Sequence, residues 1–483
     1  MAVQYKWKAL SATSLGAFVS VMNSSALLIA LPDIAKELNT SMILVIWVIM
    51  SYMLSVTILV PAIGRVADIF GRKNLYVDGF ALFTVTSFFA GLSQNGPELL
   101  ILRIVQSVGG ALMIANSAAI VTDAFPRKEL GRALGINAMV VAVGFTLGPI
   151  IGGLLTVALG WRWVFFFNVP LGIIGTIWAW LQIKEVEKMP SDQKFDWFGA
   201  ITLTGGLFGI LMAMSLGGLY GWGSLTTVIG FVVGAILMLV FVYLESRTRD
   251  PLLDLTFFKN RLMGFAYTST LFNGIANGSL TFLLIFYLQG IKSMSPFEAG
   301  LMLTPFAIAM MVAAPISGAL SDKYGSRELS SIGLLVMAAG LFGFTFINAN
   351  TSLFEIIFWQ MIMGFGSGMF NSPNNNAIMS SVPSNKRGTA SGTRVMMNNA
   401  GSVVSIAIAF AVTSSGMTPQ AMQALFAGIQ VGSRGIFVDK FIHDLSVAFY
   451  ISLFISIAAA ILSYMRGKKP EWKEDKEPAK KLS

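Results

Sequence analysis

Long apolar runs separated by short polar turns fill most of the chain. Each is close to the roughly 20 residues that a helix needs to cross the hydrocarbon core of a bilayer. Fourteen such runs lie near residues 10–31, 44–63, 75–93, 98–121, 133–158, 163–183, 198–217, 225–244, 263–288, 299–319, 330–348, 352–379, 390–413 and 446–465. The pattern predicts an all-α membrane protein with fourteen transmembrane helices.

Composition supports a membrane environment. Of the 483 residues, 55% are hydrophobic and only 12% are charged, about half the charged share of an average soluble protein. The lipid bilayer is therefore the expected surrounding partner. The chain has no cysteine and one histidine, His443, so it offers no disulfide or thiolate site and no residue cluster typical of a membrane-embedded enzyme. We expect neither enzymatic activity nor a bound metal or cofactor.

The net charge of +9 follows the membrane faces and does not form a patch for nucleic acid. Most lysines and arginines lie in the loops on one side of the predicted spans, which is also the side of both chain ends. The positive-inside rule assigns that side to the cytoplasm. We expect a multi-pass protein of the plasma (inner) membrane with both termini in the cytoplasm. Sequence patterns do not report the oligomeric state, and a monomer is our working expectation.

Two segments lie outside the predicted spans. Residues 414–444 include an amphipathic stretch after a Thr-Pro pair, which we expect to rest on the outer membrane surface or to form a lid. Residues 467–483 are charged and contain proline, so they cannot bury a core and are expected to form a disordered cytoplasmic tail.

A loop motif occurs twice. Residues 64–73 read GRVADIFGRK after the second run, and residues 318–327 read GALSDKYGSR after the tenth. A repeat at corresponding places of a membrane protein indicates an internal duplication. We therefore expect two related halves.

The motif has the chemistry of a latch between these halves. Its glycines allow a tight link between two helices, its basic residues anchor at the inner surface, and its aspartate can accept hydrogen bonds from the N-terminus of a helix in the other half. Asp123, at the inner end of the fourth run, can pair with Arg72 in one conformational state. The expected latch residues are Gly64, Asp68, Gly71, Arg72, Lys73, Asp123, Asp322 and Arg327.

These segments resemble the major facilitator superfamily. The first loop resembles the family's loop signature, the stretch around Arg103 and Gln106 its fourth-span motif, and residues 144–153 (GFTLGPIIGG) its antiporter motif, the mark of exporters. With fourteen runs, the chain resembles the drug:proton antiporter branch. This implies a major facilitator fold of two six-helix bundles with pseudo-twofold symmetry, residues 1–190 and 261–466, with two spans inserted within residues 191–260.

The antiporter motif also makes physical sense without the family. Gly148 and Pro149 remove a side chain and a backbone donor in the middle of a helix, which allows a kink and close packing. Ordinary glycine-mediated packing is the simpler alternative. The motif residues are Gly144, Gly148, Pro149, Gly152 and Gly153.

Arg103 lies inside the fourth run, where a charge costs about 2.5–3.5 kcal/mol on insertion scales and needs a partner or a cavity. The family commonly has an aspartate at the position of Asn23, and an amide cannot exchange a proton as a carboxyl group does. Proton coupling therefore cannot be assigned to Asn23. The remaining candidates for coupling are Arg103, Asp33, Glu355 and Asp78.

Amides within the runs are costly against lipid and should face a central cavity or another helix. The candidates for a substrate cavity are Asn23, Gln106, Asn273, Asn277, Gln360, Asn371, Asn375, Asn398 and Met396.

The leading expectation is a secondary transporter that exports small amphipathic or cationic compounds by alternating access, with proton antiport as the energy source. The sequence has no phosphate-binding G-x-x-x-x-G-K-[ST] pattern, so direct use of ATP is not expected. An exporter of an endogenous metabolite or lipid-like molecule is one alternative. A membrane sensor or scaffold that moves no solute is another.

Overall fold

The computed structural model describes residues 2–40, 42–126, 129–185, 196–248, 251, 253, 255–294, 296–383, 386–414 and 436–467. The regular elements in these ranges are helices. They are α1 (Ala2–Glu37), α2 (Met42–Phe70), α3 (Arg72–Gly91), α4 (Gly96–Ala124), α5 (Leu130–Leu159), α6 (Arg162–Phe166), α7 (Asn168–Gln182), α8 (Trp197–Tyr220), α9 (Leu225–Glu245), α10 (Thr256–Lys259), α11 (Arg261–Asn277), α12 (Leu280–Phe286), the π-helix η2 (Tyr287–Ile291), α13 (Pro296–Met302), α14 (Thr304–Tyr324), α15 (Ser326–Phe344), α16 (Leu353–Ser380), α17 (Arg387–Ser414) and α19 (Ile436–Met465).

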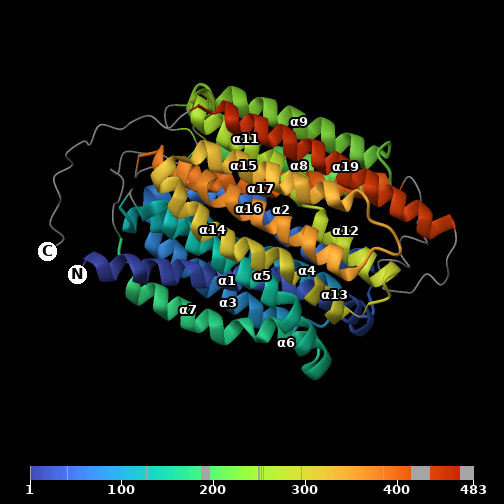
Figure 1. Cartoon of the computed structure of the whole chain (residues 1–483). Coiled ribbons are helices and arrows are strands. Elements are labelled where there is room, and N and C mark those ends of the chain that lie inside the picture. Colours follow the sequence, from blue (N-terminus) through green and yellow to red (C-terminus); the bar gives the residue numbers. More distant parts are fainter. Residues whose placement is uncertain are drawn as a thin grey trace.

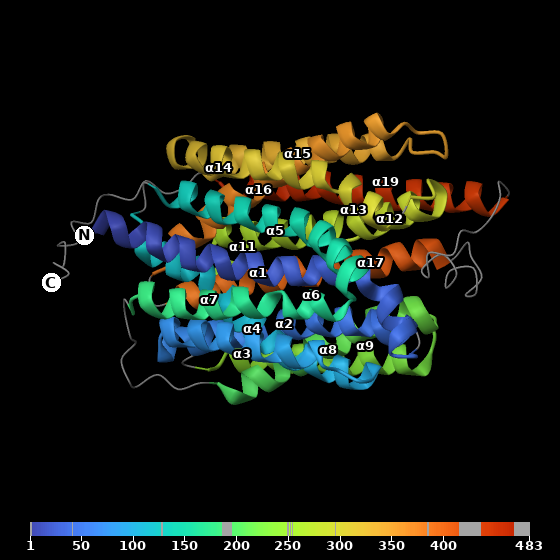
Figure 2. The same cartoon turned by 90° about the horizontal axis from the view of Figure 1, so that it is seen from below.

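Most helices run roughly along one long axis (Figures 1 and 2). Helices α1 to α7 pack largely against one another, and so do helices α11 to α19. The two groups meet mainly where α5 packs on α14 and where α2 packs on α17. The hairpin of α8 and α9, which covers the predicted pair of inserted spans, contacts both α2 and α17 through α8. We call the end of the molecule that holds Gly71 and Gly325 the inner end, after the orientation expected from the sequence.

Ten helical stretches in the described residues are long and apolar enough to cross a membrane. Exposed aliphatic side chains cover α9, such as Leu225, Ile236 and Leu239, as expected for a helix that faces lipid. The total of fourteen spans and their division into two six-helix bundles stay predictions.

Several boundaries differ from the expected runs. The run expected at 263–288 divides into α11, α12 and η2. It breaks at Gly278, where a Cβ atom would lie 2.5 Å from the Cα of Ser402, and the next amide, of Ser279, donates to the Ser405 hydroxyl. Helix α19 begins at Ile436 and so takes up part of the segment expected to lie outside the membrane. Residues 415–435 of that segment and residues 468–483 of the expected tail lie outside the described residues.

Polar residues begin several helices. A side-chain oxygen accepts from a backbone amide of the first turn at Asn95, Asp196, Ser224, Asn260 and Ser352. Such caps satisfy amides that have no partner within the helix. They fix where α4, α8, α9, α11 and α16 start.

Candidate functional site

At the inner end, Asp68 on α2 binds the first turn of α17 from the other helix group. Its Oδ1 accepts from the amide of Gly388 at 2.9 Å, and its Oδ2 accepts from the amide and the hydroxyl of Thr389, each at 2.9 Å. Arg72 donates to Oδ1 at 2.8 Å. The carboxylate is 4% exposed. A buried negative charge therefore lies against the N-terminus of a helix, where the backbone amides favour it.

Asp322 on α14 repeats this arrangement in the opposite direction. Its Oδ1 accepts from the amide of Gly131 at 3.0 Å and its Oδ2 from the amide of Arg132 at 3.2 Å, at the start of α5. The side-chain amide of Asn376 donates to Oδ1 at 2.9 Å. Each helix group thus supplies one aspartate that caps a helix of the other group.

Both crossings are close because glycines face each other. A Cβ atom on Gly64 would lie 2.5 Å from the carbonyl oxygen of Gly388, and a Cβ atom on Gly318 would lie 2.2 Å from that of Gly131. Real Cβ atoms do not approach so closely. Small residues at these four positions are what allow the helices to touch at the inner end.

Asp123, at the end of α4, adds to the first crossing because it contacts one arginine from each helix group. It pairs with Arg72, as expected from the sequence, and also accepts from Arg387 Nη1 at 2.7 Å. Arg327 lies apart from this network, with its Nε 3.4 Å from a Glu328 oxygen and its guanidinium over the Tyr464 ring. Arg327 in the second copy of the motif therefore contacts Glu328 and Tyr464, whereas Arg72 in the first copy contacts Asp68.

The turn between α2 and α3 has a further support that the sequence did not single out. Gly71 has φ of 103°, a left-handed conformation that favours glycine. Glu185, after α7, accepts from the amides of Arg72 at 2.9 Å and Lys73 at 3.0 Å. The sequence around Glu185, at the end of a predicted span, could not indicate this contact. The turn whose amides it accepts from is more than one hundred residues earlier in the chain.

The glycines of the antiporter motif lie along the contact between α5 and α1. Cβ atoms at Gly144 and Gly152 would lie 3.0 Å and 2.5 Å from the carbonyl oxygens of Phe18 and Ala26. The hydroxyl of Ser25 occupies the space where a side chain at Gly148 would stand. Pro149 is inside α5, and Gly153 is buried. This motif therefore sets how closely α5 packs on α1.

Arg103 is fully buried among helices α1 to α4. Its Nη1 donates to Asn23 Oδ1 at 2.6 Å and to Gln106 Oε1 at 2.5 Å, and its guanidinium lies 4.3 Å from the centre of the Tyr52 ring. Gln106 in turn donates to the Ser87 hydroxyl at 2.6 Å. The structure thus brings Asn23, which the sequence analysis had named separately, into contact with the Arg103 and Gln106 pair.

The carboxylates expected near the transport pathway lie in solvated places. Asp33 and Asp78 are exposed. Glu355 is exposed in the first turn of α16, where it and Ser352 form a reciprocal cap. This Ser-x-x-Glu pattern is readable in the sequence and accounts for Glu355 without a role in coupling.

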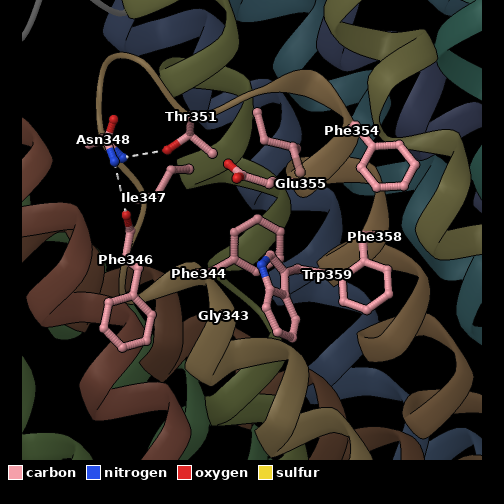
Figure 3. Close-up of a pocket in the computed structure, with 11 residues that line it drawn as sticks. Gly343, Phe344, Phe346, Ile347, Asn348, Thr351, Phe354, Glu355, Phe358 and Trp359 are labelled. Carbon is pink, nitrogen blue, oxygen red and sulfur yellow. Dashed lines mark hydrogen bonds between the residues drawn. The ribbon is translucent and has the colours of Figure 1, made fainter.

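Glu355 lies at the rim of a cavity of about 380 Å³ at the outer ends of α15 and α16. The rings of Phe344, Phe358 and Trp359 lie beside it (Figure 3). In the adjoining turn, the backbone amide of Asn348 donates to the Thr351 hydroxyl at 2.8 Å. Nearby, Lys292 donates to two carbonyl groups of this turn, and burial lowers the pKa of its amine. The cavity therefore lies at the outer end of the molecule, at the connection between α15 and α16.

The polar residues expected in a substrate cavity divide by environment. Gln360 donates to the Met302 carbonyl at 2.7 Å and Asn371 to the Ser367 carbonyl at 3.0 Å, so both make contacts between or within helices. Asn273 and Asn375 each have a buried Oδ1 without a partner among the described residues. The others are partly exposed or packed in the core: Asn277, Asn398 and Met396.

Two further arginines belong to the C-terminal helices. Arg394 lies inside α17, a signal of the kind that singled out Arg103. Arg466 follows α19 and is 2% exposed. It donates to Asn374 Oδ1 at 2.9 Å and to the Ser326 carbonyl at 3.0 Å. Burial lowers the pKa of Arg466 to about 9, so this guanidinium is still charged at neutral pH and ties α15, α16 and α19 together.

Known proteins were compared with the chain. The family model described as Major Facilitator Superfamily matches residues 13–266, 197–405 and 266–483. The riboflavin transporter RibZ of Clostridioides difficile (strain 630) is 34% identical over 80% of this chain and 83% of its own length. Multidrug resistance protein 3 of Bacillus subtilis (strain 168) is 29% identical over 93% of this chain and 87% of its own length.

Among solved structures, the human organic anion transporter MFSD10 (TETRAN) matches with a TM-score of 0.62 and 15% identity, over 93% of this chain and 99% of that one. At this identity the match concerns the fold alone. The family model covers nearly the whole chain, and the relatives named above are transporters, not enzymes. The chain therefore belongs to the major facilitator superfamily.

Proposed function

We propose that the chain is a secondary exporter of small amphipathic compounds that works by alternating access and is driven by proton antiport. The observation that carries this proposal is the closed inner end, where Asp68 and Asp322 each cap a helix of the opposite group. Contacts of this kind can be made in one conformation and released in another. The multidrug resistance relatives support export.

Proton coupling has sufficient energy for this task. One proton that enters down about 100 mV supplies about 2.3 kcal/mol, which supports a solute gradient of order fiftyfold. We place no titrating group at position 23, since Asn23 is an amide.

A second candidate is the export of an endogenous metabolite. The similarity to a riboflavin transporter favours it. The two candidates share the same mechanism and differ in the compound that binds.

The test is flux in proteoliposomes that contain the full chain. The lumen is made acidic, and uptake of Nile red and of riboflavin is followed for chains inserted with the inner end outward. We expect uptake that stops when nigericin collapses the pH gradient and that is absent from empty liposomes. Uptake of riboflavin alone would support the metabolite exporter. If neither compound moves, the proposed exporter is wrong, and the sensor or scaffold alternative gains support.

A further inference from the structure

The surroundings of Arg103 have a surplus of hydrogen-bond donors. A guanidinium has only donors, so Asn23 must turn its Oδ1 toward Arg103, and its Nδ2 must point away. Both Asn23 Nδ2 and Arg103 Nη2 are buried and have no hydrogen-bond partner among the described residues. Two adjacent buried donors therefore lack an acceptor, which native proteins rarely leave unsupplied.

The site also lacks a negative charge. The side chains that contact the guanidinium are two amides and the Tyr52 ring. In the described part of the chain, Tyr52 is the titratable neighbour whose charge would act on Arg103. A buried cation normally has an anionic partner. The described residues supply none at the contact.

The opposite helix group presents a second positive charge. Arg394 lies on α17, which packs against both α2 and α4. Its Nε is buried without a partner among the residues described, and Tyr267 is the titratable group that acts on it. Among the described residues the buried carboxylates are Asp68 at the inner end, Glu245 at the end of α9 and Asp444 near the start of α19. Each helix group therefore carries one arginine within a predicted span.

We propose that Arg103 Nη2 and Asn23 Nδ2 bind an anionic group of the transported compound, such as a carboxylate, sulfonate or phenolate. This inference rests on the proposed export function and names its substrate class. The site is buried in this conformation. Helix α17 of the other group packs on α2, which carries Tyr52, and on α4, which carries Arg103. Separation of the groups during alternating access would open it. This proposal differs from the expectation of cationic substrates.

The test uses two dyes with the same xanthene ring and opposite charge. Fluorescein is an anion near neutral pH, and tetramethylrosamine is a cation. Binding of each to the purified full chain in nanodiscs is measured by fluorescence anisotropy. We expect fluorescein to bind at least about tenfold more tightly than tetramethylrosamine, since hydrogen bonds to a charged group contribute about ten- to hundredfold in affinity.

Three variants separate the site from general charge effects. Asn23→Asp keeps the shape and gives Arg103 an internal partner, so fluorescein binding should weaken at least about tenfold. Arg103→Gln should weaken it as much, and Arg103→Lys should restore part of it. Asn350→Asp makes the same chemical change in an exposed outer turn and should leave binding unchanged.

The outcomes distinguish this inference from the export function. If fluorescein binding depends on Asn23 and Arg103 and the dye is not transported, the site stands and the exporter proposal is wrong. If tetramethylrosamine binds and is transported while fluorescein is not, the exporter stands and the anion site is overturned. The site is also overturned if neither dye binds, or if fluorescein binds equally to wild type, Asn23→Asp and Arg103→Gln.

Discussion

Neutralising Asp68 should open the inner end. In the closed conformation this buried carboxylate accepts from two amides, one hydroxyl and Arg72. Asp68→Asn removes the charge and turns at least one donor of the new amide toward groups that are themselves donors. Removing one partner of a buried charged network costs about 3–5 kcal/mol. In an open conformation water would solvate either side chain, so the cost falls on the closed state and shifts the equilibrium by roughly two to four orders of magnitude.

The assay is a distance measurement between two spin labels. The chain has no cysteine, so cysteines introduced at Asn74 on α3 and Lys323 on α14, both exposed at the inner end, can be labelled alone. We expect one short distance in the parent and a longer, broader distribution in Asp68→Asn. Asp78→Asn removes an exposed carboxylate from α3 and should change nothing. An unchanged distribution in both Asp68→Asn and Asp322→Asn would refute the latch.

Three more changes test the remaining parts of the structure. Gly388→Ala would place a Cβ atom 2.5 Å from the Gly64 carbonyl oxygen, so it should lengthen the distance between the two spin labels and lower the free energy of unfolding by about 1–3 kcal/mol. A Cβ atom at the control Gly223→Ala meets nothing within 4 Å and should leave thermal unfolding unchanged. Glu355→Gln keeps the cap of α16 and should leave dye flux within about twofold of wild type; a complete loss would make Glu355 a coupling residue. Arg466→Ala leaves Asn374 and the Ser326 carbonyl without their donor and should lower thermal stability by about 2–4 kcal/mol, with flux per folded protein retained.

The sequence predicted the chemistry of single residues better than their partners. The loop motif indicated that Asp68 accepts from a helix N-terminus, because a carboxylate in a tight inner turn between two glycines can reach the free amides of a neighbouring helix. It could not indicate that the helix is α17, since the two segments are separated by about 320 positions and pairing at that distance has no local signature. For the same reason, Arg103 and Asn23 were singled out separately, and their contact appeared only in the structure.

Glu355 illustrates the opposite case, in which a local pattern was available. Ser352 and Glu355 have the spacing of a capping box, and a carboxylate in the first turn of a helix is satisfied by backbone amides. Its place near the end of a predicted span suggested coupling instead. The cap alone is sufficient to stabilise an exposed carboxylate at this place, and the coupling role of Glu355 stays a prediction.

The latch explains how a contact of small net value can still control the conformation. When the inner end opens, water replaces the hydrogen bonds between Asp68 and the amides of α17, so each bond to this charged group contributes only about 1.5–3 kcal/mol. This would keep the closed and open states close enough in free energy for the proposed proton antiport to drive their exchange. A substitution is different, because it leaves buried donors without a partner in the closed state alone. The same network can therefore be easy to open in the cycle and costly to mutate.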